Sequence, residues 1–292
     1  MYCLIFDIFS RNKSVFFSGD DMNRRQLAYM AILTIGIAFM DITGIPSAFF
    51  VNIQVADIEP VYFTLMINFI IIGIAAFLFL RKLCPEWELG FRKAGLADGL
   101  KKYGFIGAAV AGMGFIAFYV GLSPFDRQPS FAKVLVEGVI YYVGVAIVEE
   151  LYVRGLLLNL IEKVFAKSKN STLIAVVLSA VIFGVGHIFG VLNQSFLVIV
   201  SKVVWTVGMG IFFGMVYKKT SNLWLPIMIH LLINVCALPY CFSSINGYAD
   251  LTLYIVVPVY IILGIYSFME LKKREIPVCR EVTENIELEL RG

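Results

Sequence analysis

Charged residues are scarce in this chain, and histidine is almost absent. Of the 292 residues, 15% are charged and only two are histidines. A soluble domain has nearer 25% charged residues, so this deficit argues against a soluble protein. Hydrophobic residues make up 60% of the chain and the mean hydropathy is +0.85. The composition therefore predicts an all-α, polytopic membrane protein.

Other absences narrow the functional classes. The five cysteines form no C-x-x-C pair and no even framework, so neither a disulfide scaffold nor a thiolate metal site is indicated. No H-E-x-x-H occurs, so the common zincin arrangement is excluded as well. The net charge of +3 is small and gives no indication of a nucleic-acid partner.

Long apolar runs organise the chain, and most are close to the ~20 residues that ~30 Å of hydrocarbon requires. They predict about eight transmembrane helices within a membrane domain at 27–270, between an interfacial leader at 1–26 and a tail at 271–292. Gly208, Gly210 and Gly214 include a G-x-x-x-G, which predicts close helix packing. The runs lie at roughly 27–46, 61–80, 103–122, 134–161, 171–191, 196–217, 223–240 and 251–270.

The basic residues are distributed unevenly between alternate loops. Twenty of the 24 Lys and Arg residues lie in the leader, the tail and every second loop between the runs. By the positive-inside rule these segments are cytoplasmic, and an even number of spans agrees with this. We expect an integral, multi-pass protein in the lipid bilayer with both termini in the cytoplasm.

Three charges interrupt the fourth run, at Glu149, Glu150 and Arg154. On insertion scales each costs roughly 2.5–3.5 kcal/mol at mid-membrane, so each needs a reason to be there. Glu150 and Arg154 are four residues apart, on one helix face, and we expect a structural ion pair. Glu149 points about 100° away, which predicts a different neighbour and a role as the catalytic carboxylate.

Both histidines also lie inside apolar runs. His230 and Asn234, in the run 223–240, share one helix face. His187 lies in the run 171–191. A carboxylate and an imidazole can activate water, and a second imidazole with an amide can stabilise an oxyanion, so these groups suit hydrolysis. Glu149, His187 and His230 also match the ligand count of a catalytic zinc site, and the sequence does not choose between the two mechanisms.

Three motifs occur in order on three of these runs: Glu149-Glu150-x-x-x-Arg154, Phe183-x-x-x-His187 and His230-x-x-x-Asn234. Over roughly residues 130–240 the chain resembles the CAAX protease and bacteriocin-processing family of intramembrane proteases. The resemblance implies that Glu149 and His187 activate water and that His230 and Asn234 stabilise the oxyanion. It also implies a membrane-associated or lipidated substrate, with Glu150, Arg154 and Phe183 as supporting residues. Members are catalogued as metalloproteases, and a metal-free glutamate mechanism is also argued for them.

Two other functions fit the same residues. The cluster could be a proton relay in a transporter, which predicts broken helices and inverted repeats. It could also be a structural feature of a non-catalytic immunity protein.

The predicted depths of the site residues differ. Counted from the cytoplasmic helix ends at ~1.5 Å per residue, His230 lies about 12 Å deep, Glu149 about 20 Å and His187 about 25 Å. A tilt, a kink near Pro226 or a bend at Gly184 and Gly186 would have to bring them together.

Overall fold

The computed structural model of the chain describes residues 24–43, 55–83, 88–244 and 249–273. Within these ranges nearly every residue is helical, and the only β-type pairing is an isolated bridge between Val55 and Ile58. The predicted leader at 1–26 and tail at 271–292 fall outside the described residues, except for three positions each.

In the part of the chain that the structure describes, seven helices are long and apolar enough to cross a membrane. An eighth, α2, has a shorter apolar stretch at Arg25–Met40. The predicted all-α polytopic bundle is therefore confirmed. The helices are α2 (Arg24–Thr43), α3 (Pro60–Leu83), α4 (Leu96–Gly99), α5 (Phe105–Gly121), α6 (Phe131–Glu150), α7 (Asn159–Val164), α8 (Ser171–Gly186), α9 (Phe196–Thr220), α10 (Trp224–Cys236) and α11 (Asp250–Lys272).

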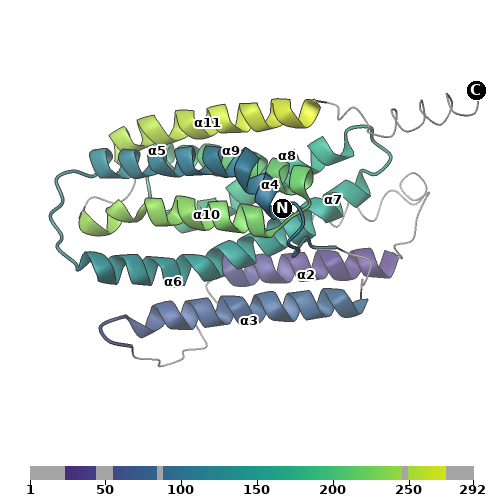
Figure 1. The fold of residues 1–292 in the computed structure, drawn as a ribbon, viewed down its shortest axis with the longest axis horizontal. Coiled ribbons are helices and arrows are strands. Elements are labelled where there is room, and N and C mark those ends of the chain that lie inside the picture. Colours follow the sequence, from purple (N-terminus) through teal and green to yellow (C-terminus); the bar gives the residue numbers. More distant parts are fainter. Residues whose placement is uncertain (1–23, 44–54, 84–87, 245–248, 274–292) are drawn as a thin grey trace, which may run out of the picture.

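The long helices pack side by side in an order that differs from their order in the sequence. α6 lies between α3 and α10, and α5 lies between α10 and α11. Figure 1 shows α3 and α11 at opposite edges of the bundle, with α6, α10 and α5 between them. α9 packs against both α8 and α11. This order brings α6, α8, α9 and α10, which carry the motifs and the residues between them, into one region.

α9 is the most buried of the membrane helices, and its glycines explain why. A Cβ atom at Gly210 would lie 2.9 Å from the Ala180 Cβ atom of α8, and one at Gly208 would lie 2.1 Å from the Tyr260 carbonyl oxygen of α11. Neither position has room for a side chain, so both helices approach the α9 backbone directly. The predicted close packing is confirmed.

α6 does not end at Glu150 but continues as a π-helix, η3 (Leu151–Leu158), and then as α7. The whole segment, Phe131–Val164, forms one span of 34 residues. π-Helical turns inside α-helices are rare and are frequent at functional sites. Glu149 and Glu150 are the last two residues before this change of helix type.

The turn between α9 and α10 is buried beneath the segment that precedes α4. The Asn222 side-chain amide donates to the carbonyl oxygens of Arg92 (2.6 Å) and Ala94 (2.9 Å). The Leu223 amide donates to the Gly90 carbonyl oxygen at 2.9 Å. Gly90 has a φ of +81°, and a Cβ atom there would lie 2.8 Å from the Ser221 carbonyl oxygen, so the close approach depends on glycine. As a result, Asn222 and Leu223, the two residues that lead into α10, are fully buried.

Candidate active site

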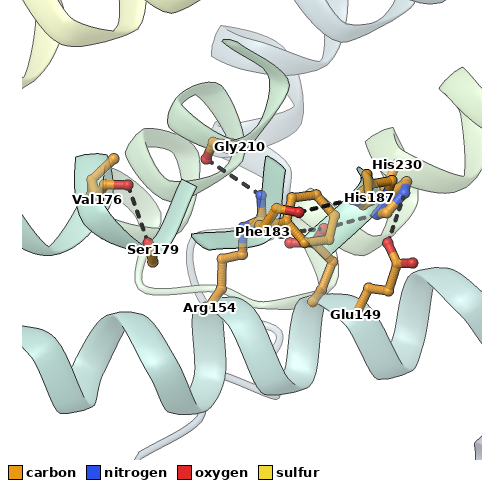
Figure 2. A network of polar contacts seen from close by, with 9 residues as sticks. Glu149, Arg154, Val176, Ser179, Phe183, His187, Gly210 and His230 are labelled. Atoms are coloured by element: carbon orange, nitrogen blue, oxygen red, sulfur yellow. Dashed lines mark hydrogen bonds and ion pairs between the residues drawn. The ribbon is translucent and has the colours of Figure 1, made fainter. Parts of the chain in front are cut away.

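The base of the site is a buried ion pair between Glu150 and Arg154. Arg154 Nη1 lies 3.0 Å from Glu150 Oε1, and the side chains are 1% and 0% exposed. Arg154 Nη2 also donates to the Gly210 carbonyl oxygen of α9 at 3.3 Å (Figure 2). The expected i,i+4 contact is therefore present, and it joins α6 and its π-helical continuation to α9.

Two aromatic rings enclose the Arg154 guanidinium. Its Cζ atom lies 4.9 Å from the centroid of Phe183 and 5.1 Å from that of Phe213. Phe183 also makes an edge contact with His187, at 4.5 Å between centroids, and Phe213 packs against His230 at 5.2 Å. Cation–π attraction partly offsets the desolvation of the guanidinium, and the rings connect Arg154 to both histidines. The sequence did not predict a role for Phe213, because nothing in it distinguishes this residue from the other phenylalanines of the chain.

His230 contacts both glutamates. Its Nδ1 atom lies 2.8 Å from Glu150 Oε1, and its Nε2 atom lies 3.7 Å from Glu149 Oε2. Figure 2 shows Glu149 extending from its helix toward this ring. The prediction that Glu149 faces a different neighbour from Glu150 is therefore wrong. The two nitrogens of one imidazole point in different directions, so a ring placed between the helices can reach two adjacent carboxylates.

His187 is held by its own helix. It begins the 3₁₀ turn η4 (His187–Val191), and its Nδ1 atom lies 2.9 Å from the Phe183 carbonyl oxygen. A carbonyl oxygen can only accept, so Nδ1 carries a proton and Nε2 of the neutral ring has a free lone pair. His187 interacts electrostatically with His230, Arg154 and Lys202. It thus belongs to the same cluster.

The depths counted from helix ends did not anticipate this meeting of α6 and α10. The count assumed that α10 begins at the membrane surface, but Asn222 and Leu223 at its start are fully buried. Pro226 lies in the first turn of α10, where its missing N–H disturbs no helical hydrogen bond. The structure nevertheless places Nε2 of His230 3.7 Å from Glu149 Oε2.

Asn234 lies one turn beyond His230 on α10 and is partly buried. Its side chain makes no hydrogen bond with another residue that the structure describes. The contacts therefore join Glu149, Glu150, Arg154 and His230 directly, with His187 beside them, and they leave Asn234 at the edge of the group.

The zinc alternative was tested against the positions of its three expected ligands. Across the described ranges, no group of three His, Cys, Asp or Glu side chains is placed to hold a metal ion. As placed, Glu149, His187 and His230 do not form a zinc ligand set.

A further cation at this site is Lys202 of α9 (Phe196–Thr220), which the sequence motifs did not include. Lys202 interacts electrostatically with Glu149 and with His187. Its Nζ atom lies 4.5 Å from the ring centroid of Trp205. A lysine inside an apolar run was the available signal.

Two cavities lie near the end of α9, away from this cluster. One, of about 380 Å³, is lined by residues that include Lys102, Lys219 and Lys273, and the other, of about 190 Å³, lies beside Arg92 and Lys218. Neither is lined by Glu149, His187 or His230.

The fold and the site together define a class: an integral, multi-pass helical membrane protein with a buried Glu–His–Arg cluster at the meeting of α6, α8, α9 and α10. Residues 129–236 match the family described as type II CAAX prenyl endopeptidase Rce1-like. The match contains all three motifs. Over this segment the match supports the resemblance to the CAAX protease family. No curated protein matches the chain.

Proposed function

We propose that the protein hydrolyses a peptide bond of a membrane-associated or lipidated substrate, using water activated by Glu149 and His187. The observation that carries the proposal is the pair Glu149–His230. These two ionisable side chains come from different spans, are 9% and 2% exposed, and have facing atoms 3.7 Å apart. Ionisable side chains within a membrane are costly in free energy, and they therefore usually mark a functional site.

In the proposed mechanism, Glu149 takes a proton from the water that attacks the scissile carbonyl carbon. The Nε2 lone pair of His187 is available to orient that water, because Nδ1 is bonded to the Phe183 carbonyl oxygen. Glu149 then delivers the proton to the departing amine, so that the carboxylate is restored at the end of the cycle.

His230 and Asn234 are assigned to the oxyanion. Glu150 accepts from Nδ1 of His230 and thereby orients the ring, and in the proposed role the ring donates to the oxyanion from Nε2. Asn234, one helical turn further along, supplies a second donor from its amide. Arg154 supports the arrangement through Glu150 and does not touch the reacting atoms.

The test is cleavage of an S-farnesylated Cys-aliphatic-aliphatic-X peptide by the purified protein in detergent or proteoliposomes. Glu149→Gln and His187→Ala should each lower kcat at least about 100-fold, which is the scale of a lost general base. The matched control is Glu137→Gln, because Glu137 is a buried glutamate of the same helix, 8% exposed, that accepts from the Glu59 amide.

The outcomes separate the possible functions. Full activity of Glu149→Gln would refute the assigned mechanism. Failure of the wild type to cleave membrane-anchored peptides would favour the non-catalytic alternative. Metal analysis of the active sample tests the zinc alternative directly.

We further propose that both termini are cytoplasmic, as the distribution of Lys and Arg predicts. Fusions of alkaline phosphatase and of green fluorescent protein to the C-terminus test this topology. Fluorescence without phosphatase activity is the expected result. Phosphatase activity would show that the C-terminus lies on the opposite side of the membrane and would refute the proposed orientation.

A further inference from the structure

Three basic residues of α6, η3 and α9 form ion pairs with glutamates, whereas Lys202 of α9 forms none with the glutamates that the structure describes. Arg154 pairs with Glu150, Lys133 with Glu59 and Glu137, and Lys218 with Glu162. In the described part of the chain, the Nζ atom of Lys202 has no hydrogen bond and no ion pair, and only the Trp205 ring lies against it. A cation–π contact compensates only part of the cost of an ammonium in an apolar span.

Lys202 lies next to the point where α8 packs on α9. A Cβ atom at Gly184 would lie 2.5 Å from Val207 Cγ2 and 3.1 Å from the Val203 carbonyl oxygen. α8 therefore crosses α9 in direct contact one turn before His187 and next to Lys202. Lys202 also interacts electrostatically with His187 of the η4 turn that follows α8 and with Glu149 of α6.

We infer that Lys202 binds the C-terminal carboxylate of the substrate, an inference that rests on the proposed peptidase function. A lysine ammonium is a point charge with three donors, and in a low-dielectric site without a bonded counterion it favours an anionic ligand. Every unmodified peptide ends in a carboxylate, whereas an acidic side chain is present only in some. An anchored C-terminus also places the scissile bond at a fixed number of residues from the end of the chain.

A rival role for Lys202 is to position or polarise Glu149, with which it interacts. The two roles make different predictions about substrates. A carboxylate anchor affects only substrates that carry the carboxylate, and it acts mainly through KM. A positioning residue affects kcat for every substrate.

The experiment compares one farnesylated peptide as the free acid and as the C-terminal amide. Wild-type protein should cleave the acid with a kcat/KM about 10- to 100-fold higher, as expected for one hydrogen bond to a charged group. Lys202→Met should lose that preference by raising KM for the acid. Lys219→Met, at the other end of α9, is the control and should retain the preference.

Three results would overturn the inference. The first is equal cleavage of acid and amide by the wild type, a comparison that needs no folded variant. The second is an equal loss of both activities in Lys202→Met, which would assign Lys202 to positioning Glu149. The third is an acid preference that survives in Lys202→Met.

A binding measurement separates this inference from the proposed reaction. In the Glu149→Gln background, a dansyl-labelled acid peptide should bind about 10- to 100-fold more tightly than its amide, and adding Lys202→Met should remove the difference. Acid-selective binding without any turnover by the wild type would retain the carboxylate site and refute the peptidase. Turnover without acid-selective binding would do the reverse.

Discussion

Replacing Arg154 by methionine should destabilise the protein by about 3–5 kcal/mol, the cost of removing the arginine from a buried ion pair, because Glu150 then keeps only His230 as its partner. The magnitude follows from burial: Glu150 is fully buried, its Oε1 atom is 3.0 Å from Arg154, and its Oε2 atom has no described partner. For a chain of this size such a loss lowers the Tm by roughly 6–20 °C. Thermal unfolding in detergent, followed with a thiol-reactive dye, measures it.

The double variant Glu150→Gln/Arg154→Met removes both charges and keeps an acceptor for His230. Replacing both members of a buried pair is often nearly neutral, so the double variant should recover most of the lost Tm. Lys218→Met is the control, because that pair with Glu162 has side chains 19% and 27% exposed and should contribute no more than about 1 kcal/mol. Equal Tm values for Arg154→Met and the wild type, or a double variant less stable than the single one, would refute the reasoning.

Gly184→Ala places a methyl group 2.5 Å from Val207 Cγ2 and should cost about 1–3 kcal/mol in thermal unfolding, with Val207→Ala restoring part of it; no loss would contradict the α8–α9 crossing. Asn222→Ala removes two hydrogen bonds to backbone carbonyls and should cost about 1–3 kcal/mol and reduce peptidase activity through displacement of α10; unchanged Tm and activity would argue against the role of the covering segment. The side-chain and amide hydrogen bonds from Ser244 lower the pKa of Asp126 from its usual 3.8, so this contact stabilises the folded state above that pH and is lost as the pH falls through the lowered value. The protection factor of the Ser244 amide, taken relative to an unprotected amide at the same pH, should therefore be higher at pH 7 than in strong acid, whereas a pH-independent protection factor would refute the linkage.

The class of protein and the position of its chemistry follow from local properties of the sequence. Low charge and long apolar runs leave only a helical bundle in lipid, because every backbone group must then be bonded within its own segment. The Glu150–Arg154 contact was predictable, since i,i+4 spacing on one helix brings two side chains together without help from other helices. The motif histidines were conspicuous because the chain has no others.

Contacts between helices depend instead on how closely the helices approach and where each begins. The sequence placed Glu149 opposite an unknown neighbour, and only the tertiary structure puts His230 there, since α10 starts beneath the segment that carries Gly90 and Arg92. The Phe213 ring on Arg154 and the position of Lys202 likewise follow from the packing of α8 and α9 at glycines that leave no room for side chains. Spacing along one helix is set by its pitch, whereas the partner across an interface is set by packing, and packing involves residues far apart in the sequence.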